Sequence, residues 1–170
     1  MEILISFIIP FIILLTVVVF IHEYGHYYFA RKYGVGVTDF SIGFGKELFG
    51  FNDKSGTRWK FCAIPLGGYV KFFGDRNVFS QAEQEELLKK YSKEDREKLF
   101  VVKPIYQRSL IVAAGPFANF LLEDVISTFK FSKPINILVP LVKSLIFIFG
   151  YKLIVLLLID LLLEFEIKIF

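Results

Sequence analysis

The sequence predicts a membrane protein, built mainly of α-helical transmembrane spans, with a cytoplasmic loop that contains a β-hairpin. Three observations predict this fold class. Residues 3–21 form an uncharged apolar run, close to the roughly 20 residues that a helix needs to cross a bilayer. Hydrophobic residues make up 55% of the chain and the mean hydropathy is +0.56, above the usual apolar share of a soluble domain. The Lys and Arg residues gather in one segment that follows this run.

The first segment, residues 1–30, is predicted to be a transmembrane helix. Pro10 lies inside its apolar run and is expected to kink it, which membrane helices tolerate. A cleaved signal peptide is the alternative interpretation. Against it, the chain starts with Met-Glu rather than with basic residues, the run is longer than a typical signal core, and no small-x-small cleavage site follows it.

Residues 31–108 are expected to form a cytoplasmic loop. This segment carries 15 of the 20 Lys and Arg residues, so by the positive-inside rule it faces the cytoplasm and Met1 lies on the far side of the membrane. Residues 35–44 and 57–73 are predicted strands. The Pro65-Leu-Gly-Gly68 sequence predicts a turn that divides the second of these stretches into the two arms of a β-hairpin.

A charged helix and two further apolar regions complete the chain. Residues 80–100 are strongly charged and predict a solvated helix or helix pair, with a capping-box pattern at Ser80 and Glu83. Residues 109–130 are predicted to form a second transmembrane helix. Residues 131–170 are a divergent apolar tail in which one or two further membrane segments are expected. The chain has a single cysteine, which excludes an internal disulfide and a cysteine-based metal site.

Two histidines and a glutamate stand at the end of the first apolar run, in the sequence Ile21-His-Glu-Tyr-Gly-His26. On a helix, His22 and His26 lie on one face, one turn apart. Two neutral imidazoles at that spacing can share one Zn²⁺ ion. Glu23 is aimed differently, which suits a general base that acts on a metal-activated water. We therefore favour a metal site over the alternative, in which these residues only mark the wet end of the span.

Asn119 is the other polar residue of interest, because it lies in an apolar run behind Gly115-Pro116. A buried amide needs hydrogen-bond partners. Its role is open between a helix–helix hydrogen bond and an amide that faces the active site.

Several motifs in this order resemble the bacterial site-2 protease family of intramembrane zinc metalloproteases, of the regulator of sigma-E protease type. The resemblance covers about residues 5–122. It rests on the following stretches: His22–His26 with Ala30-Arg31, Phe40-Ser-Ile-Gly-Phe-Gly45, Ile64-Pro-Leu-Gly-Gly-Tyr-Val-Lys71, Gln107-Arg108 and Ala113-Ala-Gly-Pro-Phe-Ala-Asn-Phe120.

The resemblance implies an endopeptidase of the bacterial inner membrane, with several spans, that cleaves the transmembrane helices of single-span substrates. His22 and His26 are then zinc ligands and Glu23 is the catalytic base. Gly67, Gly68 and Tyr69 lie near the active site, where a strand edge can pair with an unwound substrate. Asn119 matches a family asparagine that acts on substrate. The expected partners are this substrate and the lipid bilayer, with no nucleic acid.

The resemblance ends after Leu122. The family continues with PDZ domains and a later span that holds an L-D-G motif, whose Asp is the third zinc ligand. Asp160 lacks the neighbours of that motif. The sequence therefore suggests a truncated form of the protease. The alternatives are an inactive membrane remnant that holds a substrate or partner helix without cleaving it, and a metal-binding membrane protein unrelated to proteolysis.

Overall fold

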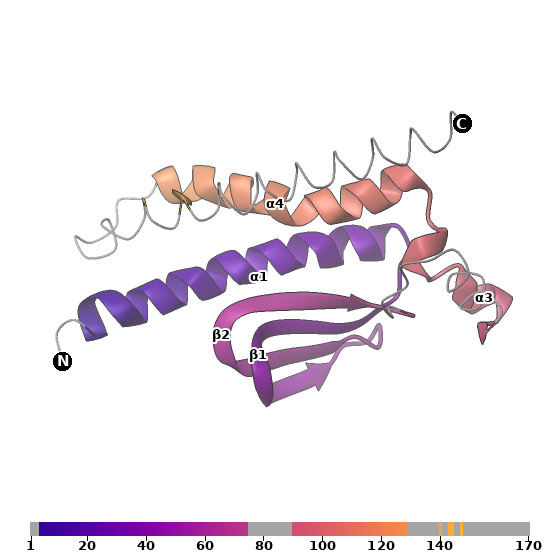
Figure 1. The fold of residues 1–170 in the computed structure, drawn as a ribbon, viewed down its shortest axis with the longest axis horizontal. Coiled ribbons are helices and arrows are strands. Elements are labelled where there is room, and N and C mark those ends of the chain that lie inside the picture. The colour runs from indigo at the N-terminus through magenta and orange to yellow at the C-terminus, as the bar shows by residue number, and fades with distance from the viewer. Residues whose placement is uncertain (1–3, 75–89, 129–139, 141–142, 145–146, 148–170) are drawn as a thin grey trace, which may run out of the picture.

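The computed structural model describes residues 4–74 and 90–128, and four single residues at 140, 143, 144 and 147. Helix α1 lies between helix α4 on one side and a two-stranded sheet on the other, and α1 and α4 run antiparallel (Figure 1). In chain order the elements are a π-helical turn η1 (Leu4–Ile8), α1 (Ile9–Lys32), β1 (Val37–Asn52), β2 (Arg58–Phe72), α3 (Lys93–Arg96), a 3-10 turn η2 (Phe100–Val102) and α4 (Ile105–Thr128).

Helix α1 begins after the π-helical turn and ends in a glycine cap. Pro10 is its second residue, in the first turn, where the backbone N–H groups have no intrahelical partner to lose. Pro10 therefore lies at the start of α1 and does not kink the helix interior as we expected. At the other end Gly34 adopts φ 70°. Its N–H donates to the carbonyl of Arg31 and the N–H of Val35 donates to that of Ala30, which is a Schellman motif.

The hairpin turn lies at residues 53–57, between β1 and β2. Asn52 pairs with Arg58 and Phe49 with Phe61, whereas Pro65–Gly68 lies inside β2. The predicted turn at Pro65–Gly68 is therefore wrong. The true turn is built by Asp53, whose carboxylate accepts hydrogen bonds from the backbone N–H groups two and four residues ahead, a common role of aspartate in turns.

Strand β1 bends sharply, which makes the sheet wider than two straight strands. Gly43 and Gly45 adopt φ 86° and 83°, a region that side-chain-bearing residues rarely enter. Before this bend, Phe40 pairs with Val70 and also with Trp59, and after it Phe51 pairs with Trp59 as well. The first half of β1 therefore lies between the two halves of β2, and the residue 64–72 half of β2 is left at an edge of the sheet.

The core joins all three layers at the cytoplasmic-facing end predicted for α1. Ala30, Val35, Val37 and Ile111 are buried there, with aromatic side chains such as Phe72 packed around them. Aromatic rings then fix the sheet to α1: Phe40 stacks on Trp59 at 4.1 Å between ring centroids, and Tyr27 meets the Trp59 ring edge-on at 5.2 Å. Such ring contacts stabilise by about 0.5–1.5 kcal/mol each beyond the area they bury.

One helix among the described residues, α1, is long and apolar enough to cross a membrane. The predicted second span at residues 109–130 corresponds to α4, a helix that hydropathy alone does not identify as a span. In the described part of the charged 80–100 segment, α3 is capped by Ser92, whose side chain accepts a hydrogen bond from the Asp95 N–H. The Ser80 cap lies outside the described residues, as does nearly all of the 131–170 tail.

Candidate metal centre

The two histidines of α1 converge as a metal site requires. Their Nε2 atoms lie 3.2 Å apart, and their rings are nearly perpendicular, with 78° between the planes. Two nitrogens bound to one tetrahedral Zn²⁺ at 2.0–2.1 Å are separated by about 3.3–3.4 Å. The pair therefore fits a zinc ion held by the Nε2 atoms of His22 and His26.

Helix α4 holds each imidazole by its other nitrogen. The Nδ1 of His26 lies 2.8 Å from the carbonyl oxygen of Ile111, which can only accept, so this nitrogen carries the proton and the Nε2 lone pair is free. The Nδ1 of His22 lies 3.0 Å from the amide of Asn119. Such outer contacts orient metal-binding histidines and fix their tautomer.

Two glycines allow α1 and α4 to approach this closely. A Cβ atom at Gly25 would meet the backbone carbonyl of Ala114, and one at Gly115 would meet the imidazole of His26 and lie 2.8 Å from Nε2 of His22. Both contacts are shorter than real Cβ contacts. Gly115 thus leaves the space that the histidine pair and a bound ion need.

Glu23 is adjacent to His22 on α1 and faces the hairpin. Gly68 of β2 packs directly on it, because a Cβ atom at Gly68 would lie 2.8 Å from the Glu23 Cγ and 2.6 Å from the Ser41 carbonyl oxygen. Neither Gly67 nor Gly68 has a positive φ. The two glycines therefore allow close approach between strand and helix, rather than the turn that we expected.

A cavity of about 330 Å³ joins these elements. Helix α1, the hairpin and α4 all contribute to its wall, and its lining is mostly apolar apart from the site residues. It is lined by Leu15, Val18, Val19, His22, Glu23, Phe44, Leu66, Gly67, Gly68 and Asn119.

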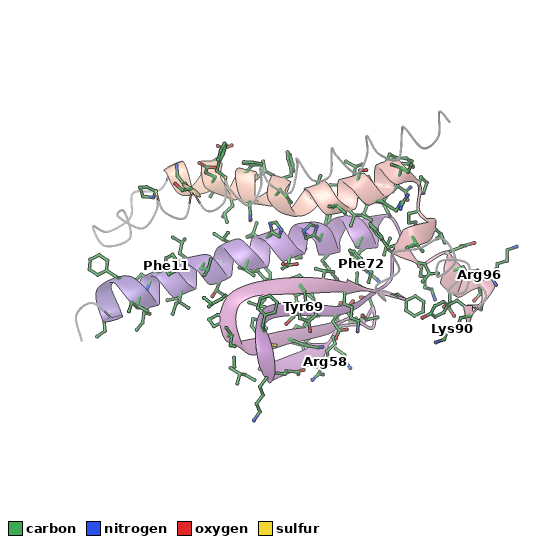
Figure 2. The ribbon with its side chains drawn as sticks, viewed as in Figure 1. Phe11, Arg58, Tyr69, Phe72, Lys90 and Arg96 are labelled. Carbon is green, nitrogen blue, oxygen red and sulfur yellow. The ribbon has the colours of Figure 1, made fainter. Side chains whose placement is uncertain are left out.

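The predicted site residues fall into three groups. His22, Glu23, Gly67, Gly68 and Asn119 all line the cavity. His26 completes the imidazole pair behind it. Tyr69 does not line the cavity; its ring stacks on Phe44, with the centroids 6.4 Å apart, and it lies nearer to α1 than Arg58 does (Figure 2).

Sequence reasoning missed Ile111 and Gly115 as parts of the site. Gly115 belongs to the Ala113–Phe120 motif, but its role depends on how closely α1 and α4 approach, which the sequence does not show. Ile111 acts through its backbone carbonyl, for which no side-chain signal exists. In the described ranges, no third His, Cys, Asp or Glu gathers with the pair.

An H-E-x-x-H helix with two converging imidazoles and an adjacent glutamate defines the class of metal-dependent peptidases. The comparison with protein families agrees with this class. The model of Peptidase family M50 matches residues 10–164, and the chain belongs to this family. The match extends beyond Leu122, so the expectation that the resemblance ends there was too narrow.

Several curated proteins are similar over the N-terminal part. A candidate zinc metalloprotease of Mesorhizobium japonicum is 53% identical over 124 residues, which are 73% of this chain and 34% of that protein. One of Rhizobium meliloti is 50% identical over 72% of this chain and 32% of its own length. The metalloprotease MmpA of Caulobacter vibrioides is 44% identical over 66% of this chain and 30% of its own length. The chain thus spans about a third of the length of these relatives.

Proposed function

We propose that this protein is an intramembrane zinc metallopeptidase of the bacterial inner membrane, which cleaves the transmembrane segments of single-span proteins. The observation that carries the proposal is the 3.2 Å convergence of two imidazole nitrogens, beside a glutamate that faces a cavity of about 330 Å³. Family membership and relatives named as zinc metalloproteases support it.

The roles of the side chains follow from their positions. His22 and His26 would hold the ion through their Nε2 atoms. When bound, zinc acts as a Lewis acid and lowers the pKa of a coordinated water to about 7. Glu23 removes a proton from the attacking water and delivers it to the leaving amine, as a general base and then a general acid.

The substrate is held by the hairpin edge. A transmembrane helix hides its peptide bonds in its own hydrogen bonds, so it must unwind before cleavage. The β2 edge at Gly67, Gly68 and Tyr69 offers backbone N–H and C=O groups to an extended segment, as in β-strand addition. Because Gly68 packs on Glu23, a segment bound at this edge lies beside the general base.

The hairpin shares the membrane depth of the site. It packs on α1 as far as Val19, within the apolar half of the helix. Apolar side chains of the sheet are exposed, among them Leu48 at 70% and Leu66 at 64%. Two of its cations are paired, Lys60 with Asp39 and Arg58 with Glu47, whereas Lys46 is exposed. We place residues 31–108 on the cytoplasmic side of the membrane as predicted, with this part of the sheet dipping into the lipid.

A third zinc ligand completes the site from outside the described residues. Catalytic zinc ordinarily has three protein ligands and one open position, and the described residues bring two together. Asp160 is one carboxylate beyond them. Zinc content measured in Asp160→Ala tests it: retention of zinc excludes Asp160 as a ligand.

The decisive experiment measures zinc per chain and cleavage of a helical single-span substrate, using the whole chain purified in detergent. Glu23→Gln should keep zinc and abolish cleavage, because the variant retains both imidazoles but cannot accept a proton. His22→Ala should lose both. Stoichiometric zinc without cleavage in the parent chain would instead support a binding role without proteolysis, and cleavage that survives in Glu23→Gln would refute the assigned base.

A further inference from the structure

Asn119 is the least satisfied polar side chain of the metal centre. It is 5% exposed, so bulk solvent reaches little of this side chain. Its Nδ2 lies 3.0 Å from the Nδ1 of His22. Its Oδ1 is buried and has no hydrogen-bond partner among the described residues. Buried side-chain polar atoms are nearly always paired, so this oxygen calls for a physical explanation.

The location of the proton on His22 decides which end of the amide faces that ring. With Nδ2 of Asn119 donating to Nδ1, the imidazole proton must sit on Nε2, which points at the Nε2 of His26, 3.2 Å away. A protonated Nε2 cannot bind a metal. Turning the amide by 180° fills the same space, because its oxygen and nitrogen are alike in shape. Oδ1 then accepts from an Nδ1–H group, the Nε2 lone pair is free, and the amide N–H groups take the position that Oδ1 held.

We propose that Asn119 is a positioning residue, whose Oδ1 accepts the Nδ1–H of His22 and thereby selects the tautomer that binds metal through Nε2. This role rests on the proposed function. It gives His22 what the carbonyl of Ile111 gives His26. Asn119 then acts on the ion through His22. The family resemblance had suggested a different role, in which Asn119 touches the substrate.

The test compares zinc affinity in three variants of the whole chain in detergent, by competition with a chromophoric chelator. Asn119→Leu keeps the volume and removes the acceptor, and it should weaken zinc binding about 10–100-fold, the usual effect of losing such an outer contact. Asn119→Asp keeps an acceptor for Nδ1–H and should stay near the parent. Thr16→Val is the control, since it removes a side-chain hydrogen bond of α1, from Thr16 to the Ile12 carbonyl.

Nitrogen NMR reads the tautomer directly. The chain has two histidines, so ¹⁵N-histidine labelling yields four ring nitrogens. In the zinc-loaded parent, both Nδ1–H protons should be protected from exchange with water. In Asn119→Leu at saturating zinc, the His22 proton should exchange rapidly while the His26 proton, held by Ile111, stays protected and serves as the internal reference.

Each result decides the matter. Weaker binding in Asn119→Leu, retention in Asn119→Asp and selective loss of His22 protection support the role. Parent-like affinity in Asn119→Leu overturns it and leaves the substrate role in place. Equal weakening in the Leu and Asp variants assigns the position to packing and also overturns it. A parent chain with no measurable zinc affinity overturns the proposed metal site itself, together with this role.

Discussion

Alanine at Gly115 puts a methyl group into the space between the two imidazoles. Its Cβ would meet the ring of His26, 2.7 Å from Cε1, and would lie 2.8 Å from Nε2 of His22. These rings are anchored on their far sides by α4, so they cannot retreat without breaking those hydrogen bonds. The methyl group and a zinc ion therefore compete for one position.

Stability and metal binding separate in this variant. Overpacking costs about 1–3 kcal/mol, and the better helix propensity of alanine returns about 1 kcal/mol, so the metal-free protein should lose about 0–2 kcal/mol. At zinc concentrations of about 100 times the parent dissociation constant, the parent gains about 2.7 kcal/mol. A variant that binds about 100-fold more weakly gains about 0.4 kcal/mol under the same conditions.

The assay is unfolding in mixed detergent micelles, with chelator or with zinc, followed by the fluorescence of Trp59. This is the single tryptophan of the chain, and its stacking on Phe40 makes it sensitive to the core. Gly25→Ala is the matched variant, because it crowds the same helix pair at the Ala114 carbonyl and not at an imidazole. A full zinc increment in Gly115→Ala would refute the assignment of the metal position.

Three other predictions concern the hairpin. Asp53→Asn should destabilise the fold by about 1–3 kcal/mol. Partial burial alone would raise the pKa of Asp53, but hydrogen bonds from Ser55, Thr57, Trp59 and Tyr27 lower it. The stability that Asp53 contributes is therefore present above the ordinary carboxyl pKa of about 3.9 and is lost as the pH falls below it, and the variant should lack this dependence of stability on pH. Gly43→Ala and Gly56→Ala both introduce left-handed backbone strain of about 1–2 kcal/mol. A Cβ at Gly43 would also lie 2.7 Å from the Ile64 carbonyl oxygen, whereas Gly56 has open space. Chemical unfolding should therefore give Gly43→Ala the lower free energy of unfolding, and equal losses of stability in the two variants would show that β1 relaxes. Gly68→Ala should displace Glu23 and slow cleavage by about 100-fold, since a shift of about 1 Å in a catalytic group can have that effect, with zinc per chain unchanged; a loss of zinc would place Gly68 in the metal site instead.

The features that sequence reasoning predicted depend on local periodicity. Helix α1 and the shared face of His22 and His26 follow from the apolar run and a four-residue spacing, because a helix of 3.6 residues per turn leaves little freedom. The strands were located for the same reason, although β1 continues to Asn52, eight residues beyond the predicted Phe44.

The hairpin turn was misplaced because glycine has more than one use. Pro65-Leu-Gly-Gly68 reads as a turn, yet its glycines are needed for contact with Phe44 and Glu23. The bend in β1 comes from Gly43 and Gly45. Both glycines are visible in the sequence, but the segments that pack against them are not. Close approach between distant segments is a tertiary property, and a local pattern does not encode it.

The site divides its work between the two sides of one helix. Successive residues of α1 are turned by about 100°, so the face that carries His22 and His26 meets α4, while Glu23 meets the hairpin. Helix α4 touches both imidazoles through their Nδ1 atoms, and the hairpin touches the base. Changes in α4 should therefore act first on metal affinity, and changes in β2 first on turnover at constant metal content. If α4 and the hairpin act separately, the effects of Asn119→Leu and Gly68→Ala on the free energy of catalysis should add, and strong coupling between these two variants would show that the two sets of contacts move together.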